Sequence, residues 1–367
     1  MQFKFRLGTK AYFGADCLKN NKEEIAAAGA RCMIVTGRSS GKASGALDDV
    51  VSVLDELSID YYIFDRVENN PSLDNVKEGG RAAREFSADF IIGIGGGSPL
   101  DASKAIAVLA VNDMNPVELF KNSFPVEPLP ILAIPTTAGT GSEVTPYSIL
   151  TRPDVETKMS FGNDQTFPKI AFLDAKYTTS MNRDITVNTA VDALSHAVEG
   201  YLTKRSTPLS DTMALEAISV FGSCIRNLVD NDFYMDMREK LLYASMLAGM
   251  VISQTGTSIV HGMGYPLTYF KDVPHGKANG LLMTEYLRFN YDNQTEKINN
   301  ILNALKIRDM DEFEKIMDKL IVNDLILSED EYVKFSRQSE KHKSVNYNIK
   351  PVTYDDILNI YKKSLSK

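Results

Sequence analysis

The 367-residue sequence has few cysteines, few histidines and no tryptophan. Its three cysteines, Cys17, Cys32 and Cys224, lie far apart and outside any C-x-x-C motif, which excludes a disulfide framework. An odd number of isolated cysteines is typical of free thiols in a reducing compartment. We therefore expect a cytoplasmic protein.

The sequence also lacks any excess of positive charge and any long uninterrupted hydrophobic run. A net charge of -8 and a pI near 5.2 argue against nucleic acid or an anionic membrane as a partner. The first ten residues contain neither the apolar region nor the cleavage site of a secretion signal. The most apolar helical stretch, residues 213–229, is interrupted by Glu216 and Arg226, so we expect a buried helix there rather than a membrane span.

Up to about residue 175, short apolar runs alternate with helical stretches. Continuous apolar runs are typical of parallel strands covered on both faces. They predict strands at 32–35, 61–64, 90–94, 131–134 and 170–173, and the stretches between them predict helices near 17–28, 43–57, 72–86 and 99–111, with Ser72 as an N-cap. We also expect an edge hairpin over residues 2–13 and a hairpin arm over 146–161.

This alternation predicts a doubly wound, mostly parallel sheet. After about residue 180 the strand-like runs end, and apolar residues recur at helical spacing, which predicts an all-α domain with a solvated outer face. A length of 367 residues also exceeds what one core usually supports. We therefore expect an α/β domain over residues 1–179 and a helical domain over residues 180–367.

A glycine-rich turn follows the predicted strand at 90–94. Gly95, Gly96 and Gly97 allow backbone N–H groups and the start of the next helix to approach an anion closely. The motif is not a P-loop, and it misses G-x-G-x-x-G because Ser98 stands where the third glycine or alanine belongs. The turn favours phosphate binding, and the alternative is a plain tight turn in which Asp101 stabilises the helix dipole.

A second loop, residues 135–145 (PTTAGTGSEVT), follows the predicted strand at 131–134 and is dense in glycines and hydroxyl groups. The carboxyl ends of parallel strands share one edge of the sheet, where open α/β folds bind their ligands. The two loops together predict a dinucleotide site, with the pyrophosphate on one loop and the ribose and nicotinamide end on the other.

Three of the four histidines, His196, His261 and His275, fall within one span of the predicted helical domain. Asp192 and His196 are four residues apart on a predicted helix, a spacing that puts Cβ atoms about 5–6 Å apart on one face. His261 and His275 each precede a glycine, which permits close backbone approach. Three imidazoles and one carboxylate predict a site for iron or zinc rather than for magnesium or calcium. The fourth histidine, His342, lies in a charged run and is expected to be solvated.

Taken together, these stretches resemble the iron-containing (group III) alcohol dehydrogenase family. The matching segments are GGGSPLDASK at 95–104, PTTAGTGSEVT at 135–145, AFLDA at 171–175, DALSHAVEGY at 192–201, HGMG at 261–264 and PHGKAN at 274–279. They span most of the chain in the family's order and at its usual separations. The resemblance implies a dehydroquinate synthase-like architecture and a homodimer.

The resemblance also implies functions for individual residues. Its metal ligands are Asp192, His196, His261 and His275, the set found above, and its pyrophosphate-binding residues are Gly95, Gly96, Gly97 and Ser98, with Asp101 nearby. Thr136, Thr137, Thr140 and Ser142 are expected on the nicotinamide side. Asn70 and Lys158 fall where relatives contact adenosine and ribose, although a turn asparagine and a solvated hairpin lysine explain both residues equally well.

Two positions depart from the family's pattern. Many relatives have another histidine four residues after the equivalent of His261, near the nicotinamide and implicated in proton handling, and here that position is Tyr265. A phenol with a pKa near 10 can donate a proton to a developing alkoxide but is a poor base at neutral pH. Tyr265 is therefore a candidate catalytic residue together with His261 and His275, and simple packing is its alternative function.

The second departure follows the strand at 32–35. Relatives that use NAD often have an aspartate where this chain has Gly37, to hold the adenosine ribose. Without that carboxylate, Arg38, Ser39 and Ser40 can bind a 2′-phosphate, and a plain surface turn is the alternative. The sequence thus favours NADP(H) over NAD(H).

The expected activity is reversible hydride transfer between a nicotinamide cofactor and a small primary alcohol or aldehyde. Fe²⁺ or Zn²⁺ would act as a Lewis acid, and the cofactor would supply the hydride chemistry. Three alternatives remain: a polyol dehydrogenase of the glycerol type, a lyase of the dehydroquinate synthase type that uses NAD transiently, and a metal-bearing binding protein with an inactive site, which Tyr265 favours slightly.

Overall fold

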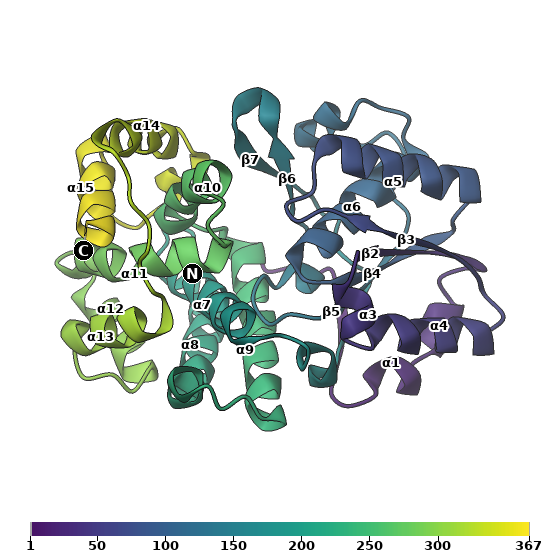
Figure 1. Ribbon diagram of the computed structural model, residues 1–367, viewed down its shortest axis with the longest axis horizontal. Coiled ribbons are helices and arrows are strands. Elements are labelled where there is room, and N and C mark those ends of the chain that lie inside the picture. The colour runs from purple at the N-terminus through teal and green to yellow at the C-terminus, as the bar shows by residue number, and fades with distance from the viewer. Residues whose placement is uncertain (1, 367) are drawn as a thin grey trace. The chain divides into compact units, whose positions relative to one another are not determined.

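The computed structural model describes residues 2–366, which divide into two compact units. One unit spans Leu7–Met181, and the other contains the described residues from Asn182 onward together with those up to Arg6. The first unit is a sheet with helices, and the second is helical, as the ribbon in Figure 1 shows. This is the predicted fold class.

Six parallel strands form the sheet of the first unit, in the order β1-β8-β5-β4-β2-β3. They are β1 (Lys10–Phe13), β2 (Arg31–Gly37), β3 (Asp60–Val67), β4 (Phe90–Gly95), β5 (Ile131–Pro135) and β8 (Ile170–Leu173). Every predicted apolar run is a strand of this sheet. The predicted hairpin over residues 2–13 is wrong, because only Lys10–Phe13 is a strand, and it pairs in parallel with β8 at the edge of the sheet.

The helices of this unit are α1 (Cys17–Asn20), α2 (Glu23–Ala26), α3 (Ser40–Ala43), α4 (Ala46–Glu56), α5 (Leu73–Phe86) and α6 (Gly97–Val111), with short 3₁₀ helices η1 (Pro116–Lys121), η2 (Ser142–Val144), η3 (Pro153–Val155) and η4 (Ala175–Thr178). The helix expected near 17–28 is two short helices, α1 and α2. Ser72 caps α5 as predicted, because its side chain accepts a hydrogen bond from the Asn75 backbone N–H at 3.2 Å. The predicted hairpin arm is present as the antiparallel pair β6 (Ser148–Arg152) and β7 (Thr157–Phe161).

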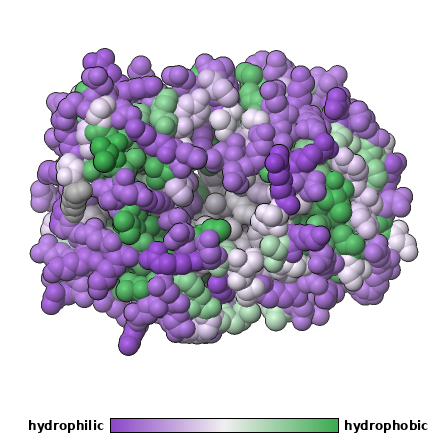
Figure 2. Space-filling model, viewed as in Figure 1, coloured by the Kyte–Doolittle hydropathy of each residue, from purple (hydrophilic) through white to green (hydrophobic). Residues whose placement is uncertain are grey.

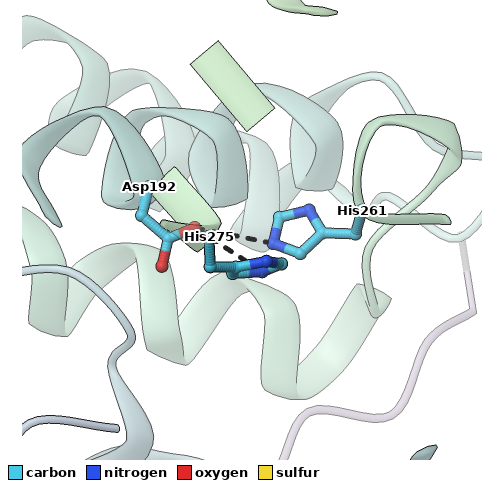
Figure 3. A group of neighbouring side chains, drawn as sticks. All are labelled: Asp192, His261 and His275. Carbon is cyan, nitrogen blue, oxygen red and sulfur yellow. Dashed lines mark ion pairs between the residues drawn. The ribbon is translucent and has the colours of Figure 1, made fainter. Parts of the chain in front are cut away.

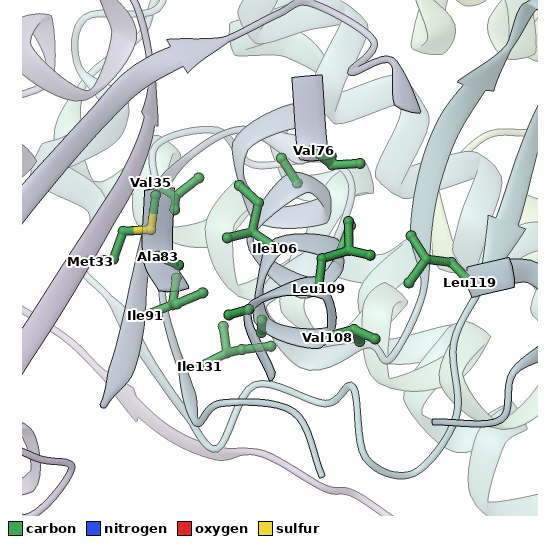
Figure 4. Packing of buried hydrophobic residues seen from close by; sticks show 14 of the residues in the cluster. Met33, Val35, Val76, Ala83, Ile91, Ile106, Val108, Leu109, Leu119 and Ile131 are labelled. Atoms are coloured by element: carbon green, nitrogen blue, oxygen red, sulfur yellow. The ribbon is translucent and has the colours of Figure 1, made fainter. Parts of the chain in front are cut away.

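Side chains on neighbouring strand positions enter two separate cores, one on each face of the sheet. Met33 and Ile91 point into the core beneath α5 and α6, where Ile106 packs against them (Figure 4). Cys32 and Ile34 belong to the core on the other face, together with side chains of α1, α2 and α4. Burial on both faces explains why these strands read as continuous apolar runs.

The second unit consists of α7 (Arg183–Tyr201), α8 (Pro208–Asp230), α9 (Met235–Thr255), α10 (Ile259–Lys271), α11 (His275–Tyr291), α12 (Thr295–Ala304), α13 (Met310–Leu320), α14 (Glu329–Glu340), the 3₁₀ helix η5 (Lys343–Tyr347) and α15 (Tyr354–Leu365). Each of the last helices buries one side and leaves polar residues outside. On the face drawn in Figure 2, hydrophilic residues predominate and hydrophobic ones gather in small patches.

Helix α8 contains the most apolar stretch of the sequence. By length and composition it is the one helix among the described residues that could cross a membrane, a criterion that core helices of globular proteins also meet. Only one side is buried, at positions such as Ala214, Ile218 and Phe221, so the expectation of a buried helix holds for that side alone.

Candidate metal and nucleotide sites

The two predicted loops lie side by side at the carboxyl edge of the sheet. Strands β4 and β5 are neighbours with Gly95 opposite Pro135, and the Thr136 backbone N–H donates to the Gly95 carbonyl at 2.9 Å. A Cβ added at Gly97 would lie 2.8 Å from Thr140 Cγ2. A side chain at residue 97 would therefore displace Thr140 and push the two loops apart.

The glycine turn leads directly into helix α6, whose N-cap makes no side-chain hydrogen bond to the first N–H groups. Gly95 has φ +148°, a conformation that favours glycine, and α6 begins at Gly97, two residues earlier than predicted. Its N-cap is Gly96, which supplies no capping side chain, and its first turn has no acidic residue. A helix start of this kind attracts an anion such as a pyrophosphate.

Asn70, Ser98 and Lys158 form one hydrogen-bonded group beside this turn. The Asn70 backbone N–H donates to Ser98 Oγ at 3.1 Å, and Lys158 Nζ donates to Asn70 Oδ1 at 2.7 Å. Asn70 is an exposed turn residue with φ +58°, whereas Lys158 is only 6% exposed. The reading of Lys158 as a solvated hairpin lysine is therefore wrong.

Arg38, Ser39 and Ser40 follow β2 and are exposed. Because β2 pairs with β4, their loop begins next to the glycine turn. A Cβ at Gly37 would lie 3.9 Å from Pro99 Cγ, which shows that the end of β2 lies close to the start of α6.

Asp101 and Ser142 are buried and bond to each other. Ser142 Oγ donates to Asp101 Oδ1 at 2.5 Å, and the Ile149 backbone N–H donates to Asp101 Oδ2 at 3.0 Å. Lys104, which the sequence did not single out, donates to Ser142 Oγ at 2.7 Å. Burial raises the pKa of Asp101, lowers that of Lys104 to about 8 and raises that of Glu143 to about 7. These contacts hold the second loop on α6, and direct contact of Asp101 or Ser142 with a cofactor stays a prediction.

Thr137 completes the second loop. It is half-buried, and a Cβ at Gly96 would lie 3.1 Å from its side chain. Thr136 itself is buried, at 3% exposed. The hydroxyl-rich loop thus packs on the glycine turn along its length.

Three of the predicted metal ligands come together in the helical unit. Asp192 lies on α7, His261 on α10 and His275 at the first position of α11. One ligand atom from each lies within 4.8 Å of the other two, and Asp192 Oδ1 is 3.9 Å from Nε2 of both histidines (Figure 3). The His196 ring stacks on the His261 ring with centroids 4.5 Å apart. Asp192, His261 and His275 fit a divalent transition metal, since imidazole and carboxylate are its usual ligands, and His196 as a fourth ligand stays a prediction.

The cluster is charged and largely buried, although the His275 side chain is 24% exposed. Asp192, His196 and His261 are 3%, 5% and 2% exposed. Burial by itself raises the pKa of Asp192, but the neighbouring imidazoles and Asn279 outweigh it and lower that pKa below its usual value. A metal cation bound by the imidazoles would stabilise the ionised Asp192 carboxylate in the same way as the positive charge of the protonated imidazoles does.

Glu199 fixes the orientation of His261, a function the sequence reading missed. Its Oε2 accepts a hydrogen bond from His261 Nδ1, and its Oε1 accepts from the Ser258 and Val260 backbone N–H groups at 3.0 and 2.8 Å. Ser258 Oγ donates to the same atom at 2.8 Å. With its proton on Nδ1, His261 presents the Nε2 lone pair toward Asp192. The spacing could have identified Glu199, because it lies seven residues after Asp192 on α7, and residues seven apart share one face of a helix.

Tyr265 and His342 extend the cluster. Tyr265 stacks on His275 with centroids 5.6 Å apart and planes at 11°, and His342 packs on Tyr265 at 5.2 Å. The expectation of a solvated His342 is wrong: the ring is half-buried, and its Nδ1 lies 2.7 Å from Ser344 Oγ. Burial, followed by the charge of Lys343, lowers the pKa of His342 to about 4. All four histidines of the sequence therefore gather in one region.

Glycines let the ligand-bearing helices approach one another. A Cβ at Gly276 would lie 1.8 Å from the Asn188 carbonyl oxygen of α7, and a Cβ at Gly264 would lie 2.4 Å from Asn279 Oδ1. Close backbone approach next to His275 was predicted from the sequence and is present.

The fold and the two sites define a class of protein: an oxidoreductase that uses a nicotinamide cofactor and a metal ion. The chain belongs to the iron-containing alcohol dehydrogenase family. Residues 8–175 match the family described as iron-containing alcohol dehydrogenase, and residues 186–365 match the family described as Fe-containing alcohol dehydrogenase, C-terminal.

Curated relatives and solved structures agree with this membership. Lactaldehyde reductase of Escherichia coli (strain K12) is 34% identical over 306 residues, covering 82% of this chain and 79% of that protein. NADPH-dependent butanol dehydrogenase of Clostridium saccharobutylicum is 31% identical, covering 87% of this chain and 81% of that protein. The crystal structure of an iron-containing alcohol dehydrogenase from Thermotoga maritima is 40% identical with a TM-score of 0.93, covering 100% of both chains. The protein is an iron-type alcohol or aldehyde oxidoreductase.

Proposed function

We propose that this protein reversibly reduces a small aldehyde to a primary alcohol at a divalent metal held by Asp192, His196, His261 and His275. The observation that carries the proposal is the convergence of three ligand atoms within 4.8 Å from three different helices. Two imidazoles and one carboxylate supply these atoms, which are the usual ligands of a transition metal, and the His196 ring stacks on one of the two imidazoles.

The bound metal would supply a Lewis acid, and the nicotinamide would supply the hydride chemistry. The chain's own residues supply binding and orientation. The glycine turn and the start of α6 hold the pyrophosphate, Glu199 keeps the His261 Nε2 lone pair directed at the ligand cluster, and the Tyr265 ring fixes one side of His275. The Tyr265 phenol is the proposed donor of the proton that the aldehyde oxygen takes up.

We propose NADP(H) as the preferred cofactor. Arg38 is exposed at the end of β2, next to the glycine turn, and Gly37 brings no carboxylate to repel a 2′-phosphate. The butanol dehydrogenase that is 31% identical to this chain is named for NADPH.

The test is a panel of primary alcohols, aldehydes, diols and glycerol, run with NADPH and with NADH. Protein reconstituted with Fe²⁺ or Zn²⁺ should show net cofactor turnover with aldehydes, faster with NADPH, and His261→Ala should lose both bound metal and activity. Preferred turnover of glycerol would favour a polyol dehydrogenase. No net turnover with any substrate, or full metal content and activity in His261→Ala, would contradict the proposal.

We also propose a cytoplasmic homodimer. The three buried free thiols support a reducing compartment, and the family resemblance supports the dimer. Light scattering in solution should give twice the chain mass of 40.7 kDa, and a monomer mass would contradict it.

A further inference from the structure

Lys104 is a fully buried lysine in the middle of α6, the helix that begins at the glycine turn. Its ammonium nitrogen Nζ donates to Ser142 Oγ at 2.7 Å and to the Tyr147 carbonyl at 2.6 Å. It also forms an ion pair with Asp101 Oδ1 at 3.6 Å. Ser142 belongs to the second loop, residues 135–145, and Tyr147 follows that loop by two residues. Lys104 therefore ties the pyrophosphate helix to the loop expected on the nicotinamide side.

The hydrogen bonds around Lys104 have only one consistent direction. An ammonium group can only donate, so the Ser142 hydroxyl accepts from Lys104 and directs its own hydrogen to Asp101 Oδ1. The other carboxylate oxygen of Asp101 accepts from the Ile149 backbone N–H at 3.0 Å. Lys104 and Asp101, one turn apart on α6, thus hold residues 142–149 from two adjacent positions.

The second loop contacts the glycine turn before it reaches Lys104. Thr136 bonds to the Gly95 carbonyl, and the Thr140 side chain lies against Gly97. The loop is then held at Ser142 by Lys104. Glu143, the next residue, is also buried, and the charge of Lys104 offsets part of the rise in pKa that burial causes there. Without the ammonium, the loop would lose its links to α6 at Ser142 and Tyr147 and would gain conformational freedom.

We propose that Lys104 is a positioning residue for the cofactor: through Ser142 and the Tyr147 carbonyl it holds the second loop in the conformation that receives the nicotinamide end. This inference rests on the cofactor site of the proposed function. Lys104 does not bind the cofactor itself, because its side chain is fully buried. A loop already held in its binding conformation loses less freedom when the ligand binds, so it binds more tightly. Loss of Lys104 should therefore weaken binding of the nicotinamide end and spare binding of the pyrophosphate on the glycine turn.

The test compares Lys104→Met with Asn112→Ala in the metal-loaded protein. Methionine keeps an unbranched chain without the charge. Asn112 is a matched control, since it is buried at the other end of α6 and also ties this helix to a later segment, through two hydrogen bonds of 2.9 Å with the Val126 backbone. Calorimetric titration gives Kd for NADPH, for NADH and for ADP, which contains the pyrophosphate but no nicotinamide.

Lys104→Met should bind both reduced cofactors about 10-fold more weakly, the effect of about one lost hydrogen bond, and should bind ADP like the wild type. Asn112→Ala should bind all three nucleotides like the wild type. Lys104→Met leaves the buried Asp101 without its cation, which can prevent folding. The comparison of Asp101→Asn/Lys104→Met with Asp101→Asn avoids this unpaired carboxylate, and the same 10-fold difference is expected between these two variants.

Wild-type affinity for NADPH and NADH in a folded Lys104→Met protein, or no difference between the two Asp101→Asn proteins, would overturn the inference. An equal loss of ADP binding would also overturn it, because the effect would then reach the glycine turn, and so would an equal loss in Asn112→Ala. The wild-type titrations separate this inference from the function beneath it. If the wild type binds none of the three nucleotides, the proposed cofactor site is refuted; if it binds them and the Lys104 variants bind them equally well, only the positioning function of Lys104 is refuted.

Discussion

Replacing Glu199 by glutamine tests whether the tautomer of His261 controls metal binding. The substitution preserves shape but exchanges one carboxylate oxygen for an N–H₂ group. Oε1 accepts hydrogen bonds from the Ser258 N–H, the Ser258 hydroxyl and the Val260 N–H at 2.8–3.0 Å, so the amide oxygen of glutamine must take this side. The new N–H₂ group then faces His261 Nδ1.

The substitution would affect metal binding by changing which nitrogen of the His261 ring carries the proton. An N–H₂ donor at Nδ1 forces the His261 proton onto Nε2, the atom 3.9 Å from Asp192 Oδ1 in the ligand cluster. Metal binding must then displace that proton. Loss of the hydrogen bond to the ring nitrogen that does not bind the metal changes metal affinity by about 10- to 100-fold. This corresponds to about 1.4–2.7 kcal/mol. Loss of a hydrogen bond to a charged group costs a further ~1.5–3 kcal/mol of stability.

The assay is chelator competition with Zn²⁺ at neutral pH, followed by thermal unfolding with and without the metal. Glu285→Gln is the matched control, since Glu285 is another nearly buried carboxylate of this unit, and it pairs with Arg288 at 2.7 Å outside the ligand cluster. Glu199→Gln should lose Zn²⁺ affinity, and Glu285→Gln should not. A folded Glu199→Gln protein with wild-type Zn²⁺ affinity would refute the reasoning about the tautomer.

Three further predictions concern the cofactor, the fourth histidine and the helix contact. Arg38→Ala should raise KM for NADPH about tenfold through loss of a charge-assisted contact and leave KM for NADH unchanged; equal effects on both cofactors would argue against 2′-phosphate binding. The folded-state pKa of His342, about 4, lies below its unfolded value, so its contribution to stability is present above about pH 6.5 and is lost as pH falls toward 4. In urea unfolding of the metal-free protein, His342→Asn should therefore reduce the stability difference between pH 7 and pH 4.5 by about 1–3 kcal/mol, and an unchanged difference would contradict the assignment. Gly276→Ala should destabilise the protein by about 3 kcal/mol or prevent folding, because its Cβ meets a backbone oxygen at 1.8 Å, whereas Gly280→Ala meets only side-chain atoms at 2.8 and 2.9 Å and should cost less in thermal unfolding.

Local sequence patterns predicted the strands of the sheet well, because burial on both faces makes each strand a continuous apolar run. The runs at 90–94 and 131–134 are strands β4 and β5 for this reason. The prediction of an N-terminal hairpin was wrong because the alternation of apolar and polar residues does not identify the strand with which a segment pairs. The partner of Lys10–Phe13 is Ile170–Leu173, far along the chain, and the pairing is parallel, which no turn signal near residue 8 can reveal.

The part of the site that consists of a rare residue type, histidine, could be predicted from the sequence. Histidine is scarce in this sequence, so the gathering of His196, His261 and His275 was visible without a structure. Glu199 and Asn279 were not visible, because buried acidic and amide residues are recognised only by what they contact across helices. His342 was misread for a related reason: its neighbours on both sides are exposed lysines, while its own ring turns inward onto Tyr265.

The ligand cluster depends on helix spacing as much as on the ligands themselves. Helix α11 carries His275 and Asn279, and it approaches α7 closely only because Gly276 has no side chain to meet the Asn188 carbonyl. A shift of α11 by the width of one methyl group would move His275 away from Asp192, since their ligand atoms are now 3.9 Å apart. The glycine that follows His275 in the sequence therefore helps to form the ligand cluster, although it has no side chain that could bind a metal.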